Sequence, residues 1–168
     1  ADVLYGDVNP SGKLPLTFYA DDSQLVDFED YSMKGRTYRY FEGKPLYPFG
    51  HGLSYTTFKY SDLSVDKSTF RKGDTIKFSV NVTNTGKCTG KETVLLYSSD
   101  LVASMIPDVK RLRAFEKVEL HPGETKTVDF VINADELAFA GDDGKWHLEP
   151  GEFRISTGSE SITITCTL

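Results

Sequence analysis

The chain has 168 residues, of which 39% are hydrophobic and 26% are charged, so it can bury a globular core and is unlike a disordered chain. The formal net charge is −6, from 19 basic and 25 acidic residues, and no basic block is longer than two residues. These features argue against nucleic acid and anionic membranes as partners, since both require concentrated positive charge. No apolar run reaches the roughly 18 residues that a membrane span requires.

The first part of the chain, up to about Thr56, is rich in residues that form turns. The opening ADVL resembles the last turn of a helix, and we expect the chain to be a C-terminal piece of a longer protein. Proline and glycine repeatedly end regular structure here, at 9–15, 42–45 and 48–52. Leu14–Phe18 predicts a short strand, and the acidic stretch 20–31 predicts a surface loop.

The remainder of the chain alternates apolar and polar side chains with the period of two that half-buried strands show. The predicted strands are 58–65, 75–84, 91–98, 111–120, 126–132, 152–157 and 161–168. The strand at 91–98 is apolar on both faces, which indicates a central position, and 134–139 predicts a single helical turn. Seven short strands separated by turn signals predict a mainly β fold, an antiparallel β-sandwich of the immunoglobulin or fibronectin type III kind.

A search for catalytic chemistry gives no convincing site. The loop carboxylates (Asp21, Asp22, Asp27, Glu29, Asp30, Asp142 and Asp143) lie among small polar residues, where the burial that raises a catalytic pKa is hard to arrange. His51, His121 and His147 are isolated, and the acids of 133–144 do not complete a calcium loop. We therefore predict no catalytic residue, no cofactor and no metal site.

The two cysteines, Cys88 and Cys166, are too few for a disulfide framework and too far apart for a metal motif. Free thiols are the preferred interpretation, and a single bridge remains the alternative.

Four longer motifs then point to a family. They are ADVLYGDVNPSGKLPLTF (1–18), YRYFEGKPLYPFGHGLSYTTFKYSDL (38–63), DVKRLRAFEKVELHPGETKTVDF (108–130) and GKWHLEPGEFRISTGSES (144–161). In this order and spacing they resemble the C-terminal end of glycoside hydrolase family 3, the β-glucosidase and β-xylosidase family. The stretch SMKGRTYRYFEG (32–43) is more similar to the β-xylosidase-type branch than to typical β-glucosidases.

The resemblance implies an architecture of barrel, α/β sandwich and fibronectin type III-like domain. Residues 1–55 then correspond to the tail of the α/β sandwich domain with an interdomain strap, and residues 56–168 to the fibronectin-like domain. It also implies that the nucleophilic aspartate lies in the barrel and the acid/base glutamate upstream of NPSGKLP. Neither position falls in this chain, so the chain alone is predicted to be inactive.

Within this frame, the aromatic segment 38–56 is interpreted as the strap between two domains. Its prolines reduce the chain entropy that opposes docking, and its glycines permit close approach. Four of its aromatics, Phe41, Tyr47, Phe49 and Tyr55, offer on the order of 10 kcal/mol of gross burial as an upper bound. Arg36, Tyr38 and Arg39 either approach substrate or brace the domain contact, and bracing is preferred. Cut from their parent sheet, residues 1–55 are expected to wrap onto the sandwich, to pair between chains or to be mobile.

Three functions follow as hypotheses. The leading one is a non-catalytic C-terminal module of a family 3 glycosidase, with the barrel and α/β sandwich domains as partners. The second is a carbohydrate-binding module for plant-polysaccharide glycans, in which an exposed strip of Trp146, Tyr60, Tyr97 and Phe139 would stack on sugars. Against it, the preferred interpretation places Trp146 in the core. A protein-interaction domain ranks last. The sequence leaves sugar specificity and localisation open, with a secreted or periplasmic location preferred over a cytoplasmic one.

Overall fold

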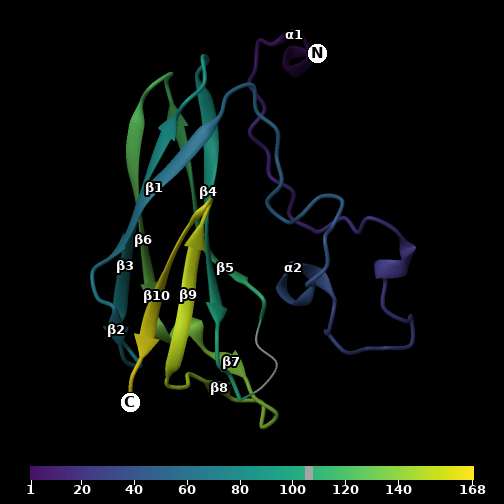
Figure 1. The fold of residues 1–168 in the computed structure, drawn as a ribbon, viewed down its shortest axis with the longest axis vertical. Helices are drawn as coiled ribbons and strands as arrows, with labels where there is room; N and C mark the ends of the chain where they lie inside the picture. Colours follow the sequence, from purple (N-terminus) through teal and green to yellow (C-terminus); the bar gives the residue numbers. More distant parts are fainter. Residues whose placement is uncertain (105–107) are drawn as a thin grey trace.

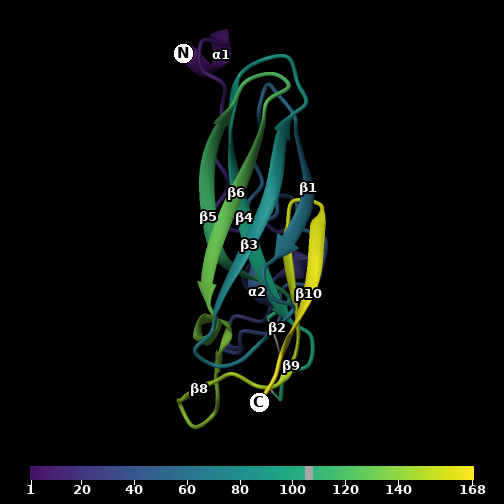
Figure 2. The same cartoon turned by 90° about the vertical axis from the view of Figure 1, so that its left-hand side faces the viewer.

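Alternating strands after Thr57 form two sheets that face each other across a hydrophobic core (Figures 1 and 2). The computed structural model describes residues 1–104 and 108–168. The first sheet has the order β1 (Phe58–Val65), β3 (Thr75–Asn84), β6 (Thr125–Asn133). The second has the order β2 (Thr69–Phe70), β10 (Glu160–Cys166), β9 (Gly151–Thr157), β4 (Gly90–Asp100), β5 (Arg111–Leu120). All neighbours pair antiparallel except β2 and β10.

Smaller elements flank the sandwich. The hairpin of β7 (Phe139–Ala140) and β8 (Trp146–His147) lies at one end of the sandwich, after the short 3-10 helix η2 (Ala134–Leu137) (Figure 1). The N-terminal segment contains α1 (Asp2–Tyr5), η1 (Asp22–Gln24) and α2 (Thr37–Tyr40). No helix among the described residues is both long and apolar enough to cross a membrane.

The predicted fold class is confirmed, because the strands bury one face as the period of two requires. The predicted strands 58–65, 75–84 and 111–120 coincide with β1, β3 and β5, and the other four match β4, β6, β9 and β10 within two residues at each end. Inward side chains of both sheets make up the core, among them Phe78, Val80, Val94, Leu96, Phe130, Phe153, Ile155 and Ile164. Cys88 is exposed and Cys166 buried, and both are free thiols.

The predicted strand at Leu14–Phe18 is wrong. Only Phe18 forms a bridge, to Tyr47, and Leu14 instead exchanges backbone hydrogen bonds with residues 50 and 51. Pro15 has no N–H group, so the two extended stretches cannot continue a regular ladder between these contacts. The acidic stretch 20–31 is a largely exposed loop apart from the single turn of η1.

Asn84, at the end of β3, links the two sheets. Its side chain is fully buried and donates to the carbonyl oxygens of Cys88 and Leu120, at 2.9 Å each. Its Oδ1 accepts from the Thr56 hydroxyl at 2.6 Å and from the Gly86 N–H at 3.0 Å. All four hydrogen-bonding positions of the amide are therefore used, and the first residues after the N-terminal segment are fixed to the sandwich.

The N-terminal segment runs along the outer face of the second sheet rather than away from it (Figure 1). The Asn9 side chain donates to the Thr89 carbonyl at 3.0 Å and accepts from the Ser54 hydroxyl and the Tyr55 N–H. Lys13 forms an ion pair with the buried Glu92 of β4 at 3.0 Å. Of the three expected behaviours, the structure adopts the wrapped one.

Replacing Asn84 tests this link. In Asn84→Ala the Thr56 hydroxyl and two carbonyl groups lose their buried partners, so the free energy of unfolding should fall by about 3 kcal/mol. Asn81→Ala, on the same strand but half-buried, is the matched control and should cost less than about 1 kcal/mol. Urea unfolding of both variants measures the difference, and equal losses would contradict the role of Asn84.

Candidate functional site

The residues singled out from the sequence lie in three different surroundings. Arg36 donates to the carbonyl oxygens of Ser32 at 3.0 Å, Asp27 at 3.2 Å and Asp30. These acceptors belong to the loop that precedes it, so Arg36 holds its own loop in shape. Tyr38, in contrast, contacts the sandwich directly.

Tyr38 is the centre of an aromatic cluster between α2 and the second sheet. Its ring stacks on Phe49 with centroids 4.1 Å apart and meets the edge of Tyr97 at 6.3 Å. Its hydroxyl accepts from the N–H of Leu112 at 3.1 Å. Burial raises the pKa of the Tyr97 hydroxyl to about 12, as expected for a phenol that the N-terminal segment shields from water.

Gly50 allows the segment to lie close to β4. Its φ is +82°, and a Cβ there would stand 2.8 Å from the Leu95 side chain and 3.0 Å from the Tyr97 hydroxyl. Any larger residue would be strained in its backbone and would push the segment away from the sheet. The contact is therefore specified by shape as well as by apolar area.

Arg39 joins α2 to the chain just before β5. Its Nε and Nη2 donate to the two carboxylate oxygens of Asp108 at 3.1 and 3.0 Å, and its carbonyl accepts from the N–H of Val109 at 2.6 Å. Burial disfavours the charged guanidinium, but the hydrogen bond and charge of Asp108 outweigh it and raise the pKa of Arg39. A paired guanidinium of this kind holds α2 to the chain before β5.

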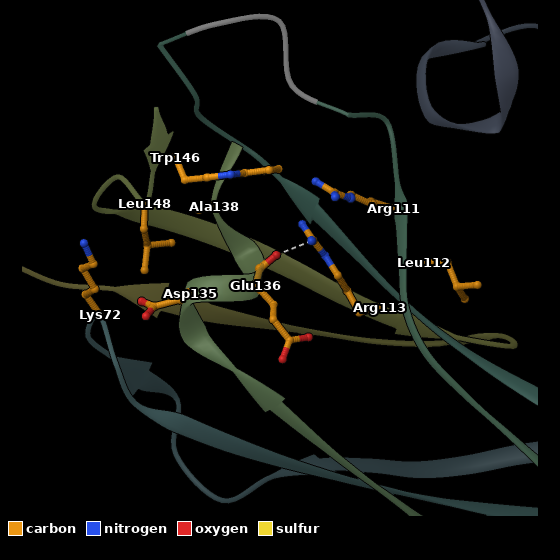
Figure 3. A pocket seen from close by; sticks show the side chains of 9 residues that line it. All are labelled: Lys72, Arg111, Leu112, Arg113, Asp135, Glu136, Ala138, Trp146 and Leu148. Atoms are coloured by element: carbon orange, nitrogen blue, oxygen red, sulfur yellow. Dashed lines mark hydrogen bonds between the residues drawn. The ribbon is translucent and has the colours of Figure 1, made fainter. Parts of the chain in front are cut away.

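The fold brings Arg39 and Trp146 to the same cavity. A pocket of about 340 Å³ is lined by both residues together with Asp108, Arg111 and Arg113. A second pocket, of about 560 Å³, shares Arg111, Arg113 and Trp146 and opens between β5, η2 and β8 (Figure 3). We call this second cavity, with its nine lining residues drawn in Figure 3, the basic pocket.

Trp146 is not part of the core, which corrects the interpretation preferred from the sequence. It is 65% exposed, because the β7–β8 hairpin lies outside the two sheets. The predicted strip of exposed aromatics is also not formed. Tyr97 is buried beneath the N-terminal segment, and half-buried Tyr60 donates its hydroxyl to Glu92 at 2.8 Å. Phe139 is half-buried at the edge of the smaller pocket.

Arg111 and Arg113 are the residues of this site that the sequence interpretation missed. They stand two apart on β5, and that spacing places both on one face of the strand. Arg113 donates to the Ser98 hydroxyl at 2.7 Å and to the Glu136 carbonyl. The Arg111 guanidinium lies over the Trp146 ring, 5.9 Å from its centroid. The repeat of arginines in RLR was the available signal.

The lining of the basic pocket is cationic and aromatic. It offers guanidinium donors and an aromatic face, groups that can hold an anion or stack on a ring. Within the ranges 1–104 and 108–168, no three His, Cys, Asp or Glu side chains are grouped to hold a metal ion.

A different surface, on the N-terminal segment, is apolar and exposed. Phe28 is 91% exposed, and Leu4, Tyr5, Tyr31 and Leu53 are also largely exposed. A shallow hollow of about 600 Å³ is lined by Pro10, Leu14, Phe18, Tyr47 and other residues of the segment. So many large apolar side chains on one segment are typical of a surface that binds another protein domain.

Comparison with known proteins covers the whole chain. The glycosyl hydrolase family 3 C-terminal domain model matches residues 1–55, and the fibronectin type III-like domain model matches residues 92–161. The chain is 43% identical over 176 residues to a periplasmic beta-glucosidase of Salmonella typhimurium, covering 98% of the chain and 23% of that protein. It is 45% identical over 166 residues to a beta-xylosidase of Formosa agariphila, covering 96% of the chain and 23% of that protein.

Solved structures agree. A β-glucosidase of Erythrobacter marinus superposes with a TM-score of 0.86 at 39% identity, covering 99% of this chain and 23% of that one. A beta-D-glucoside glucohydrolase of Trichoderma reesei has a TM-score of 0.86 at 32% identity, covering 99% and 28%. The chain thus spans about a quarter of the length of these relatives.

Removing the ring of Phe49 tests the aromatic contact between segment and sheet. In Phe49→Ala the Tyr38 and Tyr97 rings lose a stacking partner, so backbone amides of 38–53 should exchange with deuterium about tenfold faster or more. Leu53→Ala, in the same segment but 73% exposed, is the control and should leave exchange unchanged. Hydrogen exchange read by mass spectrometry separates the two, with β3 and β6 as internal references. Unchanged exchange in Phe49→Ala would contradict the contact.

Proposed function

The chain belongs to glycoside hydrolase family 3, and on this premise we propose that it is a non-catalytic C-terminal module that stabilises and positions the other domains of a β-glycosidase. The complete enzyme would hydrolyse β-glucosidic or β-xylosidic bonds, in line with the names of the relatives. The observation that carries the proposal is the exposed apolar surface of the N-terminal segment.

That surface fits the remainder of an α/β sandwich domain as its partner. The segment presents apolar side chains on its free side, while Lys13, Tyr38, Arg39 and Phe49 hold it against the sandwich. A docked domain would therefore be fixed in orientation relative to the β-sandwich. We place the division between the two regions at residues 55 and 56, just before the buried Thr56.

Arg36, Tyr38 and Arg39 are proposed as bracing residues and not as substrate ligands. Tyr38 hydrogen-bonds to Leu112 on β5, and Arg39 hydrogen-bonds to Asp108 and Val109, which directly precede β5. Arg36 donates its hydrogen bonds to carbonyl oxygens of the loop that precedes it. These contacts support a structural role.

A second candidate function is carbohydrate binding at Trp146. Its exposed ring is the observation that favours it, since aromatic faces stack on sugar rings. Affinity gels with xylan, glucan and cellulose test whether the purified chain binds polysaccharides. Unretarded migration on all three would exclude binding to these polysaccharides.

The main proposal predicts that the purified chain does not hydrolyse aryl β-glucosides or β-xylosides. The family resemblance places the nucleophile and the acid/base outside the chain, and the pockets supply cations and aromatic surface instead of a free carboxylate pair. Hydrolysis should equal that of a mock purification. Any excess that co-purifies with the chain would refute the non-catalytic assignment.

A further inference from the structure

The basic pocket combines one flat aromatic face with a fork of cations. Figure 3 shows the Trp146 ring extending toward the guanidinium groups of Arg111 and Arg113, with Ala138 and Leu148 as apolar lining. Lys72 and Asp135 stand at the other end of the cavity (Figure 3). Its volume of about 560 Å³ is in the range that holds a small ligand.

The lining of this pocket has one more cation than carboxylates, since Lys72, Arg111 and Arg113 stand against Asp135 and Glu136. Burial, and next the charge of Arg111, lower the pKa of Arg113 to about 10, so Arg113 remains protonated at neutral pH. The repulsion between the two guanidinium groups is a cost that a bound anion would offset. An anion between them would also find donors that are already held in place by Ser98 and the Glu136 carbonyl.

The acids near the pocket are engaged elsewhere. Asp108 takes both hydrogen bonds from Arg39, and Asp135 accepts from the Gly73 N–H at 3.1 Å. The Glu136 carboxylate accepts from the Asn133 N–H as part of a capping box, and Figure 3 shows it directed away from the arginines. Asp100 and Asp108 share the smaller pocket with Arg111, but among the described residues Arg111 forms no ion pair, and its guanidinium lies over the Trp146 ring.

We propose that the basic pocket binds a glycan that carries a hexuronic acid, with the sugar face on Trp146 and its carboxylate on Arg111 and Arg113. Planar guanidinium groups match a carboxylate through paired hydrogen bonds, and the aromatic face selects a ring. A neutral sugar would use the ring but leave the two cations unpaired, whereas an acidic peptide would use the cations without requiring the flat face. The inference rests on the second candidate function, for which it names the ligand class.

The chain carries its own reporter for this site, because Trp146 is the only tryptophan in the sequence. The full chain is titrated with a xylo-oligosaccharide that carries one glucuronic acid, and in parallel with the unsubstituted oligosaccharide of the same length, with free glucuronic acid and with acetate. We expect a saturable change in tryptophan fluorescence with the acidic oligosaccharide, at an affinity at least about tenfold higher than that of the neutral one. Acetate should bind most weakly, since it has no ring to stack.

Two variants and a matched control locate the binding. Arg111→Gln should weaken binding of the acidic oligosaccharide at least about tenfold, as expected when a charge-assisted hydrogen bond is lost. Arg154→Gln removes the same charge at an exposed position on β9 outside the pocket and should bind as the unaltered chain does. Trp146→Ala, followed by calorimetry, should abolish binding. Urea unfolding of each variant checks that it is folded. If Arg111→Gln does not fold, Trp146→Ala still tests the site.

Each outcome decides between the proposals. Equal affinity for acidic and neutral oligosaccharides, with no effect of Arg111→Gln, would overturn the uronic acid assignment but leave glycan binding at Trp146 standing. Acetate that binds as tightly as the acidic sugar would overturn the sugar part of the assignment. No saturable response to any ligand would overturn this inference and glycan binding at Trp146 while leaving the positioning role untouched.

Discussion

Strand β4 imposes the constraint on which the rest of the structure depends, because it is covered on both faces. Val94 and Leu96 fill the core between the sheets, while Leu95 and Tyr97 point the other way. An apolar outer face on an interior strand must be covered, and the N-terminal segment covers it with Tyr38, Phe49 and the backbone of Gly50. The path of the segment follows from this need, since only glycine at position 50 allows the approach.

The docked segment in turn sets the charges of the pocket. With α2 held against β4 by Tyr38, the adjacent Arg39 reaches Asp108 and occupies both oxygens of its carboxylate. Both oxygens of the Asp108 carboxylate therefore bind Arg39, although Arg111 and Arg113 follow only a few residues later in the chain. Because the Asp108 carboxylate is paired with Arg39, it is not the partner of Arg111 or Arg113 on β5.

The sequence predicted most strands, because short-range periodicity controls them. It did not predict the site, because contacts between distant residues form it. Seven of the ten strands were predictable, β4 because it is apolar on both faces and the other six because a half-buried strand must alternate. The strands β2, β7 and β8 were not predicted, because two residues are too few to show a period. Leu14–Phe18 has an apolar pattern typical of a strand, but Pro15 lacks the N–H group that a regular hydrogen-bond ladder needs. Trp146 looks like a core residue by composition, yet its hairpin lies beyond the sheet edges. The grouping of Arg39, Arg111 and Trp146 depends on residues more than 100 apart, which no local pattern encodes.

The net charge illustrates the same limit for function. An overall charge of −6 argues against partners that need an extended positive field. A single carboxylate in a pocket interacts mainly with charges within roughly 10 Å, because more distant charges are largely screened at 0.1 M salt. Within that distance the lining of the basic pocket has three cations, Lys72, Arg111 and Arg113, against two carboxylates, Asp135 and Glu136. An acidic protein can therefore hold a local site for an acidic ligand, and the placement of a few charges decides it where their sum does not.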